Sequence, residues 1–240
     1  MGSAVFRNPW TWVLAALVPL TLFPQIDLAA SALFFDAQAR GFPFRVHPIG
    51  EFARKILPIF LFTAAGLIAL AGAAAAILKR PVAGIRPPMA LLVVGSLALG
   101  PGLVVNVILK DYWGRARPST IAEFNAGHQP DRRYTPPLII SDQCPDNCSF
   151  PSGHAALGFW TVSLALIAPP RRRRAAFAAA LAFGLAMGAV RIAQGGHFLS
   201  DVAYSGAIVV GLTMGLYRII RRHDRSAAQK NNYQEPLRGP

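Results

Sequence analysis

Three short polar clusters interrupt an otherwise apolar sequence, and each contains residues that can bind or act on an anion. They are KDYWGRARP at 110–118, PSGH at 151–154 and RIAQGGHFLSD at 191–201. Arginine side chains match the oxygens of a phosphate in bidentate fashion. Histidine can serve as a nucleophile or as a general acid and base near neutral pH. The clusters therefore predict a site for phosphate chemistry.

A histidine and an aspartate in the third cluster are separated by about one helical turn. Asp201 follows His197 by four residues, so its carboxylate can reach one ring nitrogen and leave the other free to attack. His154 stands beside the predicted anion site and can give a proton to a leaving oxygen. A single histidine at a helix end is more often an ordinary interfacial residue. Together with the cations around them, however, these three residues favour one composite catalytic site.

The same clusters contain the parts of an anion cradle. Charges at a hydrocarbon boundary are costly, so their presence there points to function. The cations at these predicted helix ends are Lys110, Arg115, Arg117 and Arg191. Ser152 and Gly153 stand where the following helix is expected to begin, and the free amides of a helix N-terminus bind anions. Gly153 also lets the backbone approach a ligand closely.

The segments between the clusters are apolar enough to cross a membrane. Of the 240 residues, 53% are hydrophobic and 15% are charged, whereas a soluble domain has about 25% charged residues. A span takes about 20 apolar residues and must be helical to pair its backbone amides. The runs are 8–26, 56–78, 87–109, 150–170, 175–190 and 202–217. The sequence predicts an all-α, polytopic membrane protein, a six-transmembrane-helix bundle over residues 1–220.

Basic residues gather at one end of these predicted helices. The clusters KRPVAGIR, PPRRRR and RIIRRHDR share a side, which the positive-inside rule assigns to the cytoplasm. The polar motifs then lie at the outer headgroup level, so we expect a bacterial inner-membrane protein whose active site faces the periplasm. Topology and anionic headgroups explain the net charge of +13 better than binding to nucleic acid does.

The two ends of the chain carry further expectations. The first run could be a signal peptide, since Arg7 precedes it, but no small-x-small cleavage site closes it before Asp27, which favours a retained helix. The basic tail, 221–240, has almost no apolar content and is expected to be disordered.

Both cysteines lie in the long polar loop at 111–149, which is expected on the outer side, in the stretch CPDNC. Cys144 and Cys148 could be two unrelated thiols, but the space outside an inner membrane is oxidising and favours a short disulfide. A zinc site would need more ligands than this stretch offers, so no metal is expected there.

The order and spacing of the clusters resemble the type 2 phosphatidic acid phosphatase family. Its signatures are Lys-x6-Arg-Pro, Pro-Ser-Gly-His and Ser-Arg-x5-His-x3-Asp. The first is matched from Lys110 to Pro118, the second is complete, and the third runs from Arg191 to Asp201. One position departs from the pattern, because Val190 stands where the family has serine. That departure puts one hydrogen bond outside the reacting groups in doubt.

The resemblance implies a six-helix membrane phosphatase that uses no metal or other cofactor. His197 is then the nucleophile that forms a phosphohistidine, Asp201 orients it, and His154 is the acid and later the base. The resemblance assigns phosphate binding to Lys110, Arg117, Ser152, Gly153 and Arg191. Arg115 lies outside the signature and is expected to be peripheral.

A site at the outer headgroup level implies a lipid phosphate as substrate. The stretch DQCPDNCSFPSGHA is similar to stretches of lipid A phosphatases, which favours lipid A, and Arg132 and Arg133 could help hold its large headgroup. Undecaprenyl diphosphate and phosphatidylglycerol phosphate stay open as alternatives. Vanadium haloperoxidases share the anion cradle but are soluble, and an inactive lipid-binding protein would not need every catalytic position intact. The oligomeric state is left open.

Overall fold

The computed structural model describes residues 9–124 and 132–234, and within these ranges the protein is helical. The only β-type pairings there are two isolated bridges, Asp36 with Gly41 and Val82 with Ile85. The elements run in the order α2 (Pro9–Leu22), α3 (Pro24–Ala32), η1 (Pro43–Val46), α4 (Pro48–Glu51), η2 (Phe52–Ile56), α5 (Leu57–Leu78), α6 (Pro87–Leu97), η3 (Ala98–Leu109), α7 (Lys110–Tyr112), η4 (Pro118–Thr120), α8 (Gly153–Trp160), α9 (Val162–Ile167), α10 (Pro170–Ala193) and α11 (Leu199–Gln234). The expected all-α membrane protein is confirmed at this level.

Four stretches of helix are long and apolar enough to cross a membrane. They are Pro48–Leu78, Pro87–Tyr112, Pro170–Ala193 and Leu199–Asp224. A fifth results if α2 and α3, which are bent by 84° at their junction, count as one broken span. The run predicted at 150–170 forms the shorter apolar stretch Gly153–Ile167, whose helix is interrupted at Thr161. The predicted number of six full-length spans is therefore not reproduced by length and composition alone.

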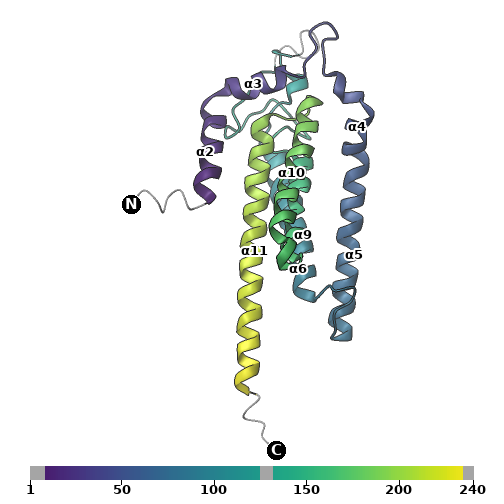
Figure 1. Cartoon of the computed structure of the whole chain (residues 1–240). Helices are drawn as coiled ribbons and strands as arrows, with labels where there is room; N and C mark the ends of the chain where they lie inside the picture. The colour runs from purple at the N-terminus through teal and green to yellow at the C-terminus, as the bar shows by residue number, and fades with distance from the viewer. Residues whose placement is uncertain (1–8, 125–131, 235–240) are drawn as a thin grey trace, which may run out of the picture.

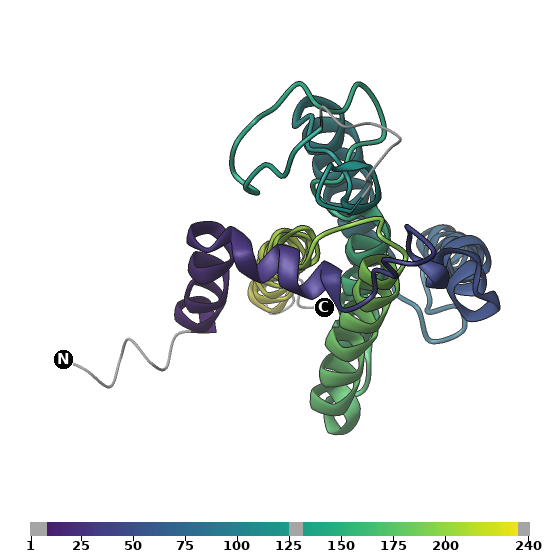
Figure 2. The ribbon, with the colours of Figure 1, turned by 90° about the horizontal axis from the view of Figure 1, so that it is seen from above.

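The bend between α2 and α3 follows from a proline. Pro24 opens α3, and the residue before a proline is disfavoured in the helical region, so Phe23 leaves it with φ −119° and ψ 86°. The chain then turns, and α3 lies across the end of the bundle over the start of α11 (Figures 1 and 2). The first predicted run ends at residue 26, whereas α3 continues to Ala32 and contains Asp27 as a buried residue.

The centre of the bundle is α8, which packs against α10 and α11. Small residues let the helices approach closely, as is usual in membranes. A Cβ atom added to Gly158 would lie 2.9 Å from the Cα of Gly184, and one added to Gly188 would lie 2.2 Å from Val202. Trp160 is fully buried here and donates from Nε1 to the carbonyl of Val93 at 2.9 Å. In contrast, α5 stands at the edge of the bundle in Figure 1.

The last helix extends further than the sequence predicts. α11 runs from Leu199 to Gln234 and so includes residues 221–234 of the tail that the composition predicts to be disordered. The last six residues of that predicted tail lie outside the described residues. So do Arg7, Asn8 at the start of the first predicted run, and residues 125–131 of the long outer loop.

Candidate active site

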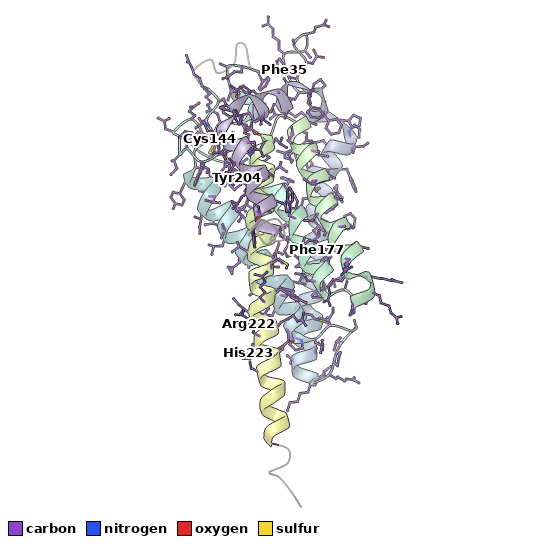
Figure 3. All side chains as sticks on the ribbon, turned by 60° about the vertical axis from the view of Figure 1, so that its left-hand side comes forward. Phe35, Cys144, Phe177, Tyr204, Arg222 and His223 are labelled. Carbon is purple, nitrogen blue, oxygen red and sulfur yellow. A yellow bond between two sulfur atoms is a disulfide. The ribbon has the colours of Figure 1, made fainter. Side chains whose placement is uncertain are left out.

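The three motifs meet at the end of the bundle that α3 crosses. Backbone hydrogen bonds tie their segments together: Ser149 N–H donates to the Arg115 carbonyl at 2.8 Å, Ser119 N–H to Gly195 at 3.0 Å, and Ser152 N–H to Asp201 at 3.3 Å. In Figure 3, Phe35 and Cys144 mark this end, and Arg222 and His223 lie toward the opposite one. Residues of all three clusters are therefore neighbours in space.

His197 is buried with a fixed ring orientation. Its Nδ1 lies 2.6 Å from the carbonyl oxygen of Ser149, and because a carbonyl only accepts, Nδ1 carries the hydrogen. Nε2 then holds the free lone pair. Burial lowers the pKa of His197 to about 3, and the nearby Asp201 carboxylate opposes the shift. A neutral imidazole with a free Nε2 has the form that a nucleophile requires.

Asp201 lies beside His197 without making the hydrogen bond that the helical spacing suggests. Its Oδ2 is 3.7 Å from Nδ1 of His197, while Ser149 Oγ donates to the same oxygen at 2.5 Å and Phe198 N–H at 2.8 Å. The Ser149 residue therefore links the two, with its carbonyl on the histidine and its hydroxyl on the aspartate. At 3.7 Å the carboxylate still stabilises positive charge that develops on the ring.

Arg115 is the main correction to the sequence analysis, which made it peripheral. Its side chain is 0% exposed and donates from Nη1 to Asp201 Oδ1. Nη2 donates to Asp27 Oδ2 at 2.8 Å, Nη1 also reaches Ser200 Oγ at 2.9 Å, and Nε donates to the Thr135 carbonyl at 2.7 Å. Every donor edge is thus used, and the guanidinium bridges Asp201, beside His197, to Asp27 of α3.

The surroundings of Arg115 keep this bridge charged. Burial works against the charged form, but the carboxylates of Asp201 and Asp27 outweigh it and raise the pKa of Arg115 above its ordinary value. The aromatic rings of Phe198 and Tyr134 lie 4.4 Å and 5.1 Å from its guanidinium carbon, within cation–π range. A buried ion pair with all its hydrogen bonds made is costly to break from one side.

The N-terminus of α8 forms one wall of the site. Ser152 caps the helix, accepting from Ala155 N–H at 3.4 Å, and its own carbonyl accepts from Ser205 Oγ at 2.9 Å. At Gly153 there is no room for a side chain, because a Cβ atom would lie 2.6 Å from Oδ1 of Asn106. The structure thus places both residues where the sequence predicts, at the positive end of a helix dipole.

Arg117 and Arg191 line a cavity of about 450 Å³ that opens beside Gly196. Arg191 is 7% exposed and binds Oε1 of Gln194 through Nη1, but its Nε has no partner. An unpaired buried donor on a cation is unusual in a folded protein and marks a place where an anion would be bound. Burial lowers the pKa of Arg117, because it removes part of the guanidinium from water. The positive charge of nearby Arg45 lowers this pKa further.

Lys110 and His154 line a second cavity, of about 430 Å³, together with Gly153 and apolar residues of α5 and η3. Nε2 of His154 lies 3.0 Å from the Arg54 carbonyl and therefore carries a hydrogen, which leaves Nδ1 as the nitrogen that can exchange a proton with a substrate. Arg54 itself lines the first cavity. His154 thus stands between the two cavities, whereas neither His197 nor Asp201 lines either of them.

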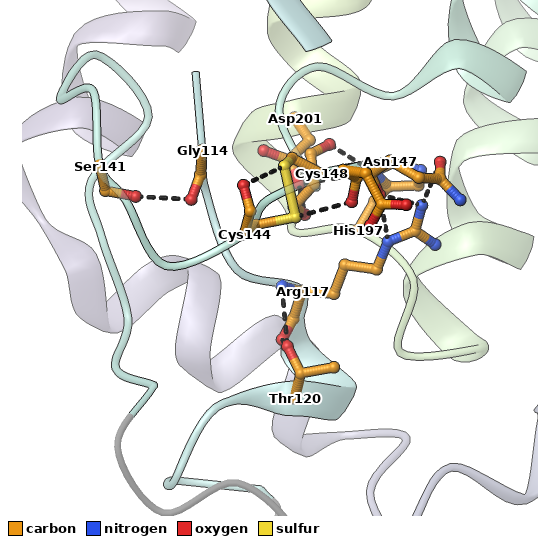
Figure 4. The surroundings of a disulfide bond; sticks show 11 residues. Gly114, Arg117, Thr120, Ser141, Cys144, Asn147, Cys148, His197 and Asp201 are labelled. Carbon is orange, nitrogen blue, oxygen red and sulfur yellow. Dashed lines mark hydrogen bonds and ion pairs between the residues drawn. A yellow bond between two sulfur atoms is a disulfide. The ribbon is translucent and has the colours of Figure 1, made fainter. Parts of the chain in front are cut away.

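A disulfide shapes the loop beside Arg117. The structure joins Cys144 to Cys148, which closes the ring CPDNC, and Asn147 within it has φ 47°. The Asn147 carbonyl accepts from Arg117 Nε at 3.0 Å and Nη2 at 2.6 Å, and Asn147 Oδ1 accepts from Nη2 at 2.7 Å (Figure 4). The ring therefore orients the arginine.

A comparison with models of protein families identifies the family of this chain. The model of the PAP2 superfamily matches residues 89–225, which is more than half of the chain. The protein belongs to the PAP2 superfamily. The resemblance inferred from the three signatures is thereby confirmed.

Curated relatives within this superfamily cover most of the chain. A protein of Francisella tularensis subsp. novicida named Lipid A 4'-phosphatase is 35% identical over 206 residues, which is 84% of this chain and 89% of that protein. Proteins of the same name from Rhizobium etli and Rhizobium leguminosarum are 34% and 31% identical, over 80% of this chain and 78% and 86% of their own lengths. No solved structure matches the chain.

Several residues of this PAP2 site lie outside the signatures. Asp27, Asn147 and Ser149 hold the motif residues by hydrogen bonds, and Arg45 and Arg54 add charge to the larger cavity. Only the unusual charge of Asp27 directly after an apolar run could have indicated its role from the sequence. Among the described residues no group of three or more His, Cys, Asp or Glu side chains has the geometry to hold a metal ion.

Proposed function

We propose that this PAP2 protein is an integral membrane phosphatase that removes a phosphate group from a lipid through a phosphohistidine on His197. The observation that carries the proposal is the state of His197: neutral, with Nδ1–H held by the Ser149 carbonyl, next to a cavity lined by Arg117 and Arg191. Arginine forks and the start of α8 would neutralise the transferring phosphoryl group, which is mostly what phosphoryl transfer asks of a protein.

In the first step, Nε2 of His197 attacks the phosphorus atom and the P–O bond to the lipid breaks. Protonated His154 gives the proton on Nδ1 to the leaving oxygen, while the Arg54 carbonyl holds Nε2–H. The positive imidazole that forms is stabilised by the Asp201 carboxylate 3.7 Å away. Lys110, Arg117, Arg191 and the amides at Ser152 and Gly153 hold the phosphoryl oxygens.

In the second step, neutral His154 takes a proton from water, and the water oxygen attacks the phosphohistidine. The P–N bond breaks, inorganic phosphate leaves, and both histidines return to their starting states. Every proton and bond is accounted for by these two residues and water, so no step requires a metal or another cofactor.

Lipid A is the substrate that we favour. The cavity lined by Arg117 and Arg191 adjoins a third cavity, of about 280 Å³, and the two share Arg45, Arg117 and Ser119. Arg132, which was expected to help hold a large headgroup, lines this third cavity, whereas Arg133 does not. Two connected basic cavities suit a headgroup with more than one anionic group, and the relatives' names point to lipid A. Undecaprenyl diphosphate and phosphatidylglycerol phosphate are the competing substrates.

The proposed topology has the site on the periplasmic side of a bacterial inner membrane. α2 with α3 forms one broken span and α8 with α9 a short span inside the bundle, which together with the four long spans makes six. The support is the clustering of basic residues at the end opposite the site, which the positive-inside rule assigns to the cytoplasm.

The deciding experiment is to trap the intermediate with labelled lipid A in detergent. Quenching with alkaline SDS within one turnover should leave acid-labile, base-stable label on the wild type and none on His197→Ala, whose turnover should fall by more than about a thousandfold. His223→Ala removes an exposed histidine from the opposite end and serves as the matched control. Activity should persist in EDTA and be inhibited by vanadate.

Label that survives in His197→Ala, or activity that EDTA abolishes and magnesium restores, would refute the proposed chemistry. A panel of lipid A, undecaprenyl diphosphate and phosphatidylglycerol phosphate then ranks the substrates by phosphate release. Binding without release would indicate an inactive lipid-binding protein, and halide oxidation with added vanadate would indicate a haloperoxidase.

A further inference from the structure

A separate pocket of about 340 Å³ lies at the end of the bundle opposite the active site. It is formed where α6 and α10 begin, beside α9 and the later turns of α11 (Figure 1). One part of its wall is apolar and consists of Met89, Leu92, Leu166, Ile167 and Ile220. The other part carries Arg86, Arg173, Tyr217, Arg221 and Asp224. The lining thus combines apolar side chains with three arginines and one aspartate.

The arginines of this pocket have no carboxylate partner among the described residues. Arg173 Nη1 and Arg221 Nη1 both donate to the Tyr217 hydroxyl, at 3.3 Å and 3.2 Å, and Arg173 Nη2 donates to the Ala168 carbonyl at 3.3 Å. Arg173 Nε is buried and has no partner at all. Long bonds to two neutral oxygens, the Tyr217 hydroxyl and the Ala168 carbonyl, leave most of the charge of the two guanidinium groups uncompensated, which favours binding of an anion.

The backbone adds to the positive potential. Both α6 and α10 begin at this pocket, so the positive ends of their helix dipoles lie there. Positive-inside topology alone does not explain the arrangement, because Arg171, Arg172 and Arg174 on the same turn of α10 are exposed and do not line the pocket. Arg173 differs from them in being turned onto Tyr217.

We propose that this pocket binds the headgroup of an anionic phospholipid from the membrane leaflet opposite the active site. Arg86, Arg173 and Arg221 would hold the phosphate, and the apolar wall would hold the first part of an acyl chain. Basic pockets between helices at this depth are the sites that suit such headgroups. The apolar wall favours a lipid over free phosphate, and three arginines against one aspartate favour a net negative headgroup. The site goes beyond the phosphatase activity and does not depend on it.

The test is retention of phosphatidylglycerol by the purified full chain, measured by native mass spectrometry and by the midpoint of thermal unfolding in detergent. Phosphatidylglycerol is a phosphodiester, so it is not a substrate for a phosphomonoesterase. Arg173→Gln with Arg221→Gln should weaken its binding by about tenfold or more, because each change removes a charge-assisted hydrogen bond. Arg171→Gln with Arg174→Gln loses the same net charge outside the pocket and should bind like the wild type.

Other arms distinguish the remaining possibilities. Arg86→Gln should also weaken binding. This variant should fold like the wild type, because the Arg86 side chain makes no hydrogen bond within the described residues. It therefore keeps the test valid if the double substitution does not fold. Equal weakening by both double variants would mean general surface attraction and would refute the site. Equal binding of phosphatidylcholine, or a thermal shift by inorganic phosphate that depends on Arg173, would refute an anionic lipid as the occupant.

Discussion

Arg115 is the residue whose role differs most from its expected one, and it makes a clear prediction. Replacing it with glutamine leaves Asp27 and Asp201 as buried carboxylates without their shared cation. We expect kcat to fall by about a hundredfold or more while KM changes little, because the guanidinium contacts Asp201 and not the cavities.

Two controls separate positioning from simple loss of fold. Asp27→Asn keeps Arg115 and Asp201 paired and should cost less activity than Arg115→Gln. Arg133→Gln removes an arginine of the same loop that lines neither cavity and should be neutral. A rise in KM with unchanged kcat would instead make Arg115 part of the substrate-binding surface.

His197 predicts how stability depends on pH. Its pKa is lowered to about 3, whereas an unfolded histidine titrates near 6.5, so the unfolded chain binds one more proton between these values. The stability that this residue contributes is therefore complete above about pH 6.5 and is lost as the pH falls toward 3. His197→Gln should flatten the fall of the unfolding midpoint between pH 7 and 4, measured in detergent. Parallel curves for the two proteins would contradict the buried neutral state.

His154 predicts a dependence on the leaving group. Its Nδ1 is the nitrogen available to a leaving oxygen, since the Arg54 carbonyl engages Nε2. His154→Ala should slow hydrolysis of an alkyl phosphate strongly and of a nitrophenyl phosphate much less, because the better leaving group needs no proton. Comparing kcat/KM for the two soluble substrates measures this, and equal losses would rule out His154 as the acid.

At the scale of elements, the ring closed by Cys144 and Cys148 is predicted to set the position of Arg117. Opening the ring by Cys144→Ser with Cys148→Ser frees Asn147, which accepts three hydrogen bonds from the arginine. We expect KM for the lipid to rise by roughly tenfold, since the charge-assisted hydrogen bonds that orient the Arg117 guanidinium are lost. Asn147→Ala in the intact ring should reproduce part of the effect. An unchanged KM in both variants would show that the ring serves only the loop.

At the scale of the whole molecule, the proposed topology predicts which compartment reaches the disulfide. The chain has two cysteines, and both lie on the loop at the site end. A membrane-impermeant thiol reagent added to spheroplasts should label them only after reduction, if that end faces the periplasm. Labelling that requires rupture of the inner membrane would invert the topology, and the substrate would then lie in the cytoplasmic leaflet.

The sequence by itself determined the family and the kind of protein, and it predicted the motif residues of the site. Spacing within each motif is a local property, and apolar runs between charged clusters report membrane helices directly, because both depend on residues close together in the chain. The identity of the family therefore followed from Lys110, Arg117, His154, His197 and Asp201 before any fold was known.

Only the tertiary structure decided how those residues are held. Arg115 meets Asp27 across 88 positions of sequence, after the bend at Pro24 brings α3 over the bundle, and no local pattern encodes that pairing. The partner of His197 is the Ser149 carbonyl rather than Asp201, because a backbone group from another segment comes closer than the side chain one turn away. Spacing limits what a residue can reach, whereas packing between distant segments decides what it contacts.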